Sequence, residues 1–248
     1  MQVSIAAIIC AAGYSSRMGG KKKEYLPLTI GNLPGEKPIT VLGAAVSAFA
    51  SSPRIGPIVI TVPAADLTAS GSVTSGAAEA SLSQELRSRV LFVQGGPTRR
   101  ASVHNALLLL EGHHPSHVLI HDGARPWIKR NLIEKVIEAV IKYKAVIPAL
   151  PLVETPKELS ANTPNSPDVK FIERHLRRID LYTAQTPQAF QFPEILSAHE
   201  KAREKEEREH YEFTDDAEIW GEFEGRVAVI SGDLENRKIT FPEDLNAK

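Results

Sequence analysis

Residues 3–20 read VSIAAIICAAGYSSRMGG, an apolar run of strand length that passes directly into small residues and then an arginine. Similar apolar runs follow at residues 57–62, 90–93, 117–121 and 145–149, and they alternate with helix-length segments such as 39–50 and 131–143. This alternation is typical of βαβ units, in which helices cover a mostly parallel sheet. We therefore predict a Rossmann-like, three-layer α/β fold. Ligands of such folds bind beyond the carboxyl ends of the strands.

The composition is that of an ordinary globular chain. Its 248 residues carry a formal charge of -1 at pH 7, which gives no general reason to expect nucleic acid or an anionic membrane as a partner. No apolar stretch approaches the roughly 20 residues that span a bilayer, and the N-terminus shows no secretory signal, so we expect a cytoplasmic protein. The single cysteine, Cys10, lies in the first apolar run, where we expect a buried, inert thiol in a reducing compartment.

Three segments interrupt the alternation of strands and helices. Residues 64–83 are rich in Ala, Ser and Gly, and we expect a flexible surface connection that leads into a helix. Residues 151–180 carry four prolines among polar residues and are too long for an ordinary connection. We predict that they form a functional arm on a single domain spanning residues 1–248. Residues 200–210 mix charges of both signs, as a solvated helix face does.

The small residues that follow the first apolar run are suited to phosphate binding. Ala11, Ala12 and Gly13 allow the backbone to approach a ligand closely, and Arg17 with the lysines at 21–23 supplies positive charge. The segment is not a P-loop, because GxxxxGKS and GxxxxGKT are absent, and it lacks the glycines of a dinucleotide fingerprint. On its own residues it is either a triphosphate cradle or a glycine-containing surface turn with solvated lysines.

Seven motifs follow one another along the chain. The first is AAGxxxRM at residues 11–18, followed by KEYL at 23–26. The others are GGPTRRASV at 95–103, HDGARP at 121–126, TPK at 155–157, the block 178–188 ending in TPQ, TDDA at 214–217, and NRKIT at 236–240 ahead of PEDL at 242–245. Together they resemble, over nearly the whole chain, the cytidylyltransferases that act on 2-C-methyl-D-erythritol 4-phosphate. The resemblance implies a magnesium-dependent enzyme that joins CTP to a sugar- or polyol-phosphate and releases pyrophosphate.

The resemblance also implies a role for each residue that matches a motif. Arg17 and Lys23 would act in catalysis by holding the triphosphate, and Arg178 and Lys238 by holding the acceptor phosphate. The implied nucleotide-binding residues are Ala11, Ala12, Gly13, Gly96, Arg99, Ser102, Asp122 and Gly123, and the implied substrate-binding residues are Arg125, Thr155, Arg178, Thr186 and Lys238. Asp122 would also meet the ribose or Mg²⁺. For Arg125 there is an alternative, in which it pairs with a carboxylate and fixes its loop.

Members of this family dimerise through the arm, and arm residues help to complete the site of the partner. The resemblance therefore implies a C2 homodimer in which Thr155 serves the other protomer. The chain departs from the family pattern at Ser15, where glycine is frequent, at Lys22, where proline is frequent, and at Pro97, where an acidic residue is common. The lysines at 21–23 are consequently alternatives for the triphosphate contact. We choose Lys23 because it precedes the Tyr25-Leu26 pair.

Three other functions stay open on the sequence alone. The same chemistry on ribitol 5-phosphate is the nearest, because related cytidylyltransferases share the nucleotide loop and the Asp-x-x-Arg-Pro motif. A catalytically silent nucleotide-binding protein is the second, and the presence of two separate cation sets for phosphate argues against it. A dinucleotide-dependent oxidoreductase is the third, and the missing glycine pattern disfavours it.

Overall fold

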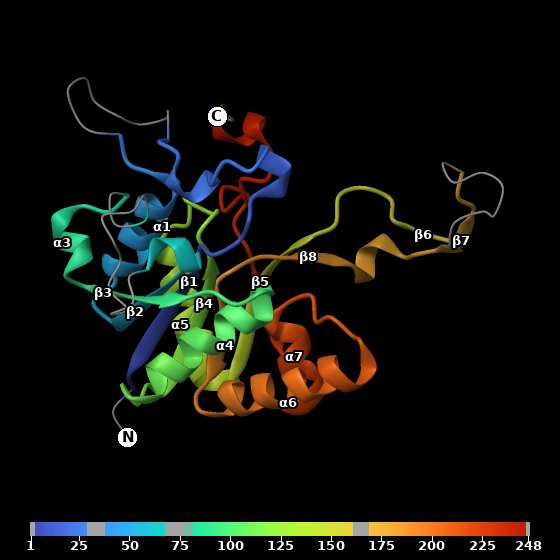
Figure 1. The fold of residues 1–248 in the computed structure, drawn as a ribbon. Helices are drawn as coiled ribbons and strands as arrows, with labels where there is room; N and C mark the ends of the chain where they lie inside the picture. The colour runs from blue at the N-terminus through green and yellow to red at the C-terminus, as the bar shows by residue number, and fades with distance from the viewer. Residues whose placement is uncertain (1–2, 29–37, 68–77, 79–80, 161–168, 247–248) are drawn as a thin grey trace.

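The computed structural model describes residues 3–28, 38–67, 78, 81–160 and 169–246, and it has a central sheet between two layers of helices (Figure 1). Among these residues, eight strands form the sheet in the order β10-β5-β9-β4-β1-β2-β3, with β8 paired to β5. The strands are β1 (Ile5–Cys10), β2 (Ile55–Val62), β3 (Val90–Gln94), β4 (His117–Asp122), β5 (Ala145–Pro151), β8 (Tyr182–Ala184), β9 (Gln188–Gln191) and β10 (Ala228–Ser231). Neighbours pair in parallel except where β8 or β9 takes part. The predicted mostly parallel α/β fold is confirmed.

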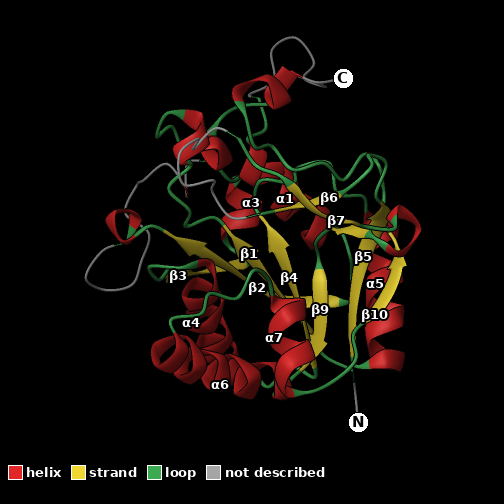
Figure 2. Cartoon of the chain, turned by 90° about the vertical axis from the view of Figure 1, so that its right-hand side faces the viewer, coloured by secondary structure: helices red, strands yellow, loops and turns green. Residues whose placement is uncertain are grey.

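Helices cover both faces of the sheet because successive side chains of a strand point to opposite sides. Ile5, Ala7 and Ile9 of β1 pack in one core cluster with α1 (Val41–Ala50) and α5 (Arg130–Tyr143). Ala6 and Ile8 pack in a second cluster with α4 (Arg99–Glu111), α6 (Glu194–Glu209) and α7 (Asp216–Phe223), which lie together on one side of the sheet in Figure 2. A short helix, α3 (Gln84–Arg87), precedes β3. The central strand is therefore apolar on both faces, as its sequence requires.

The predicted elements agree with the observed ones to within two residues at each end. The part of residues 64–83 that the structure describes leads into α3 as expected, and the rest lies outside the described residues. The expected surface location is wrong for Ala78 and Leu82, because both side chains are buried in the core cluster that contains α1. Residues 200–210 form the charged end of α6 and are mostly exposed. The sequence reasoning missed β9, which inserts antiparallel between β4 and β5. No helix in the described part of the chain combines the length and the apolar character needed to cross a membrane.

The chain leaves the sheet after β5 and returns to it at β8, and the segment between them projects away from the body (Figure 1). Its described residues include a two-stranded antiparallel sheet of β6 (Lys157–Leu159) and β7 (Ile172–His175). Pro164 and Pro167 of the predicted arm lie outside the described residues. The observed excursion matches the predicted position of the arm at residues 151–180. Its role in dimerisation stays a prediction.

Candidate active site

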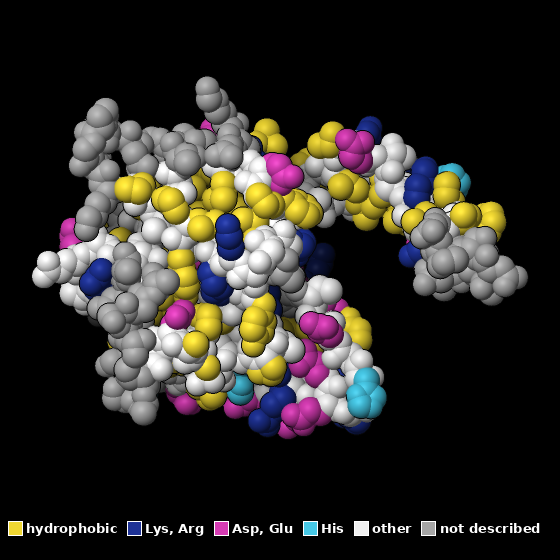
Figure 3. All heavy atoms as spheres, turned by 45° about the horizontal axis from the view of Figure 1, so that its top comes forward, with side chains coloured by type: hydrophobic (Ala, Val, Ile, Leu, Met, Phe, Trp, Pro, Cys, Tyr) yellow, Lys and Arg dark blue, Asp and Glu magenta, His cyan; other side chains and the backbone are white. Residues whose placement is uncertain are grey.

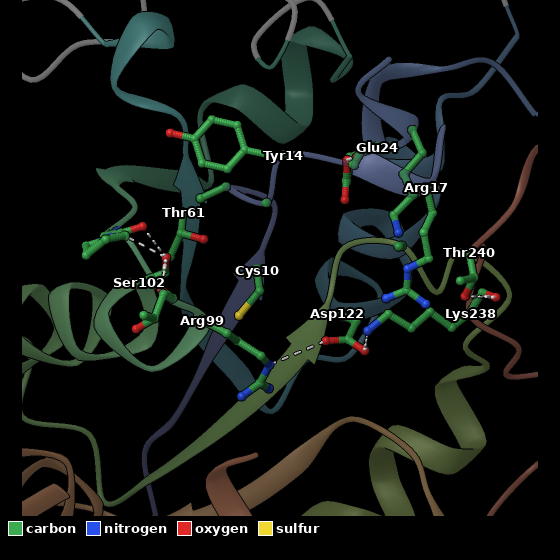
Figure 4. Close-up of a pocket in the computed structure, with 18 of the residues that line it drawn as sticks. Cys10, Tyr14, Arg17, Glu24, Thr61, Arg99, Ser102, Asp122, Lys238 and Thr240 are labelled. Carbon is green, nitrogen blue, oxygen red and sulfur yellow. Dashed lines mark hydrogen bonds and ion pairs between the residues drawn. The ribbon is translucent and has the colours of Figure 1, made fainter. Parts of the chain in front are cut away.

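A cavity of about 390 Å³ opens beyond the carboxyl ends of β1 and β4 (Figure 4). In the close-up, Arg17, Asp122 and Lys238 lie on one side of it, and Tyr14, Thr61 and Ser102 lie on the other. Of the residues predicted from the sequence, those that line the cavity are Ala12, Gly13, Arg17, Lys23, Gly96, Arg99, Ser102, Asp122 and Lys238. Residues that are far apart in the chain thus meet at one edge of the sheet, where the parallel strands end.

Asp122 is the centre of the charge arrangement in this cavity. It is the last residue of β4, and three cations converge on its carboxylate. The Nζ atom of Lys238 lies 3.0 Å from Oδ2, Nε of Arg125 lies 3.4 Å from Oδ2, and Nε of Arg99 lies 3.8 Å from Oδ1. Burial raises the pKa of the Asp122 carboxyl, but the three cations outweigh burial and hold it far below its usual range. Asp122 is therefore ionised at every physiological pH.

Arg99 is held by a second carboxylate on the far side from the cavity. Its Nη2 atom lies 2.7 Å from Oδ2 of Asp216, and Nε2 of His199 lies 3.3 Å from Oδ1 of the same carboxylate. Asp216 and His199 are fully buried. Burial raises the pKa of Asp216, but the charge of Arg99 and the contact with His199 lower it on balance to about 2. Asp216 thus fixes the guanidinium of Arg99 at the cavity edge, and the sequence reasoning gave it no such role.

Two glycines allow a close approach of the segment between β3 and α4, Gly95 to the loop that follows β1 and Gly96 to the first turn of α4. A Cβ atom on Gly95 would lie 2.2 Å from Cβ of Ala12, and one on Gly96 would lie 2.4 Å from Cβ of Ala101. The hydroxyl of Ser102 accepts a hydrogen bond from the Gly96 backbone at 3.0 Å. The first turn of α4 therefore stands at the cavity with its backbone fixed, and the partial positive charge of a helix N-terminus favours an anion there. The predicted contact of Ser102 with the nucleotide stays a prediction.

The structure separates the three lysines at 21–23. Lys23 lines the cavity, whereas Lys22 points to the backbone of the loop and Lys21 is exposed outside the cavity. Burial lowers the pKa of Lys23, and the positive charges of Lys238 and Arg17 lower it further, although Glu24 opposes them. Cations that repel one another across a cavity favour an anion between them. This arrangement agrees with the choice of Lys23 for the triphosphate contact.

Four predicted residues lie in the wall behind the cavity. Ala11 is buried, and a Cβ atom on Gly123 would lie 2.9 Å from the Cys10 carbonyl oxygen, so both positions need small residues. Arg125 donates to the Asn236 carbonyl oxygen at 2.8 Å and pairs with Asp122, as in the alternative in which it fixes the loop. The hydroxyl of Thr186 accepts from the Asp122 backbone at 3.1 Å. For Arg125 and Thr186, the predicted contact with substrate stays a prediction.

The two predicted arm residues do not reach the cavity of their own chain. Arg178 and Thr155 are exposed, and Nη1 of Arg178 donates to the Val153 carbonyl oxygen at 2.8 Å within the arm. The arm projects away from the body in Figure 1. If these two side chains contact the acceptor, they do so from another protomer.

Several cavity residues were not found from the sequence. Tyr14 stands 87% exposed at the cavity, and Thr61, Glu24, Glu212 and Thr240 also line it. Thr61 and Glu212 lie outside the seven sequence motifs, so their position at the cavity is evident only from the folded chain. Cys10 also lines the cavity and is only partly buried, so the expected full burial is wrong, but desolvation still raises the pKa of its thiol to about 12. That pKa agrees with the predicted inert thiol.

The fold and the site together define a mostly parallel α/β protein with a cation-lined cavity at the carboxyl ends of its strands, where proteins of this fold bind ligands. The profile of the IspD family, 2-C-methyl-D-erythritol 4-phosphate cytidylyltransferase, matches residues 5–248. The chain belongs to this family.

Individual relatives agree with that assignment. The bifunctional enzyme IspD/IspF of Bradyrhizobium sp. (strain ORS 278) is 40% identical over 243 residues, which are 97% of this chain and 54% of the relative. The crystal structure of 2-C-methyl-D-erythritol 4-phosphate cytidylyltransferase from Thermus thermophilus is 28% identical, with a TM-score of 0.66 and coverage of 99% of this chain and 96% of that one. The 4-diphosphocytidyl-2C-methyl-D-erythritol synthase of Anaerococcus prevotii is 26% identical, with a TM-score of 0.72 and coverage of 98% and 93%. The chain spans about half the length of the curated relatives it matches.

Proposed function

We propose that the chain transfers the cytidylyl group of CTP to 2-C-methyl-D-erythritol 4-phosphate, in the non-mevalonate synthesis of isoprenoid precursors. The observation that carries this proposal is the convergence of Arg17, Lys23 and Lys238 on one cavity that contains a single strongly ionised aspartate. A triphosphate and an acceptor phosphate together bring several negative charges into one site. Family membership supports the choice of these two substrates.

The reaction requires no covalent intermediate on the enzyme. A phosphate oxygen of the acceptor attacks the α-phosphorus of CTP, a new P–O bond forms, and the bond from the α-phosphorus to the bridging oxygen breaks, releasing pyrophosphate. Arg17 and Lys23 stabilise the charge that develops on the departing pyrophosphate. Two unit charges 4 Å apart interact by about 4 kcal/mol at an effective dielectric of 20, so the loss of one of these cations should slow turnover by roughly several hundred-fold.

Magnesium fits this site as an ion carried mainly by the nucleotide. Among the described residues, no group of three or more His, Cys, Asp or Glu side chains is placed to hold a metal ion. Asp122 supplies one carboxylate that is ionised at all relevant pH values. Mg²⁺ is commonly bound by one or two carboxylates together with substrate phosphates. We propose that Asp122 holds it, and that the ion, when bound, neutralises charge on the triphosphate.

The arm supports a proposed homodimer. Val153, Phe171 and Ile179 are 75%, 65% and 76% exposed, and hydrophobic side chains cover much of the arm in Figure 3. Exposed apolar surface of this kind marks an interaction site. We propose that the arm of one protomer places Arg178 and Thr155 at the cavity of its partner.

Mixing two inactive variants tests the arm. In a heterodimer of Arg178→Ala and Lys23→Ala chains, one cavity has its own Lys23 and receives Arg178 from the partner, so activity should return on mixing. If each arm served its own chain, every site would lack one of the two residues and the mixture would stay inactive. Sedimentation of the wild-type chain provides the oligomeric state independently.

The substrate assignment is tested by pyrophosphate release with CTP and Mg²⁺, measured side by side on 2-C-methyl-D-erythritol 4-phosphate and ribitol 5-phosphate. Preference for the former supports the proposal, and preference for the latter keeps the mechanism but changes the acceptor. Release with neither, despite CTP binding, would make a catalytically silent nucleotide-binding protein the better description. Arg17→Ala and Lys23→Ala should each slow release by roughly several hundred-fold in a folded protein, while Lys21→Ala, outside the cavity, should not. A cytoplasmic location stays a prediction.

A further inference from the structure

Lys22 holds the two ends of the turn that follows β1. Its Nζ atom donates to the Ala11 carbonyl oxygen at 2.7 Å and to the Gly13 carbonyl oxygen at 2.5 Å. The side chain is only 20% exposed, and Nζ lies 5.6 Å from the ring centroid of Tyr25. Burial lowers the pKa of Lys22 on balance, although the charge of Glu24 opposes this effect. The ammonium group is thus engaged by protein atoms, and Lys22 is not among the residues that line the cavity.

Glu24 connects Lys22 to the next part of the same loop. Its carboxylate oxygen Oε2 accepts from the Ser15 hydroxyl at 3.3 Å and lies 4.0 Å from Nζ of Lys22. Glu24 is 4% exposed. Ser15 has a φ of +50°, in the left-handed region that is unfavourable for a residue with a Cβ atom. Contacts from Lys22 and Glu24 therefore reach three points of the loop, one of which holds an unfavourable backbone conformation.

We propose that Lys22 and Glu24 form a clamp that holds residues 11–15 in the nucleotide-binding conformation before the nucleotide arrives. This inference rests on the proposed function, because it assumes that CTP binds against this loop. Lys22 is then a positioning residue that acts through backbone carbonyl groups. Lys23, one position further on, acts directly on phosphates. Preorganisation of this kind increases affinity because less ordering remains to be done on binding.

The two roles predict different patterns of ligand affinity. CTP and CMP share the nucleoside and the α-phosphate and differ in the β- and γ-phosphates. Loss of the clamp should weaken both ligands by a similar factor, since the loop that both ligands contact loses its fixed conformation. Loss of a direct phosphate contact should weaken CTP far more than CMP. A comparison of the two ligands therefore separates a positioning lysine from a phosphate-binding one.

The test is isothermal titration calorimetry of CTP and CMP with wild type, Lys22→Met, Lys23→Met and Lys21→Met. Methionine keeps the length of the side chain and removes the donor. Lys22→Met should weaken both ligands on the order of tenfold, the effect of losing a charged hydrogen-bond donor. Lys23→Met should weaken mainly CTP. Lys21→Met, the matched control with the same change of charge outside the cavity, should bind both as wild type does.

Two results would overturn the clamp. One is wild-type affinity of Lys22→Met for both ligands, and the other is a loss by Lys22→Met that is confined to CTP. If Lys22→Met does not fold, Glu24→Gln replaces it. This variant keeps the shape of the side chain but removes the charge next to Lys22. It should weaken the binding of CTP and of CMP by one common factor, smaller than the factor expected for Lys22→Met. Equal binding of both ligands by Glu24→Gln and wild type would then refute the proposal. Failure of the wild-type chain to bind either ligand would instead refute the proposed function.

Discussion

Replacing Asp216 by asparagine removes the buried charge that holds Arg99 at the cavity edge. Asp216 is fully buried, and its Oδ2 atom lies 2.7 Å from Nη2 of Arg99. A pKa of about 2, in place of the ordinary value of 3.8, corresponds to about 2 kcal/mol of stabilisation at neutral pH. Removal of one partner of a buried ion pair costs about 3 to 5 kcal/mol. Because the side chain of Arg99 is 31% exposed and can be solvated in part, we expect Asp216→Asn to destabilise the fold by about 2 kcal/mol.

Urea unfolding at several pH values measures this loss. The pKa of Asp216 is depressed in the folded state, so its stabilisation is fully present above pH 3.8 and is lost as the pH falls through about 2. The difference in unfolding free energy between wild type and Asp216→Asn should be constant near neutral pH and should decrease in acid. The same variant should bind CTP more weakly, because Arg99 loses its anchor.

A matched control for this experiment is Glu111→Gln, which removes an exposed carboxylate at the end of α4. Its free energy of unfolding should stay within about 0.5 kcal/mol of wild type. A wild-type free energy of unfolding for Asp216→Asn at pH 7 would rule out this role of Asp216. So would a difference in unfolding free energy between the two proteins that stays the same at low pH.

Three further predictions concern other parts of the same site. Burial lowers the pKa of His121 from 6.5 to about 4, so between these pH values the unfolded chain takes up a proton that the folded chain excludes. The free energy of unfolding should therefore fall by about 3 kcal/mol as the pH drops from 6.5 to 4. His121→Gln should reduce the slope of unfolding free energy against pH. Burial also lowers the pKa of Lys23, so kcat/KM for CTP should decline with rising pH earlier than expected for a free lysine. Lys23→Arg should move that decline to higher pH, because arginine stays protonated. Identical pH profiles of kcat/KM in the two proteins would contradict this prediction. A methyl group on Gly95 would lie 2.2 Å from Cβ of Ala12, so Gly95→Ala should displace the loop after β1 and lower turnover by about a hundredfold. The control is Gly112→Ala, whose added methyl group meets nothing within 4 Å and should leave turnover unchanged.

The predicted site residues that line the cavity come directly after strands in the chain. Arg17 and Lys23 come in the loop after β1, Gly96 and Arg99 come after β3, and Asp122 ends β4. Parallel strands end at one edge of a sheet, so an apolar run followed by small or charged residues is a local signal of a site at that edge. The roles of Asp216, His199 and Lys22 had no local signal, because each depends on which side chains become neighbours after folding. The sequence motif TDDA contains Asp216 but does not indicate that it supports Arg99.

The alternation of parallel strands and helices, the two apolar faces of β1 and the small residues of the loop can be predicted from the sequence, because these properties depend on residues close together in the chain. The insertion of β9 and the set of cations around Asp122 depend on tertiary contacts. Arg99 and Lys238 lie far apart in the chain, and both are brought within 4 Å of the same carboxylate. Burial weakens solvation and strengthens attraction between opposite charges, so the ionisation of Asp122 is a property of the folded chain. The same holds for the lysines at 21–23, since adjacent residues of one type acquire different roles from the direction in which the fold points each side chain.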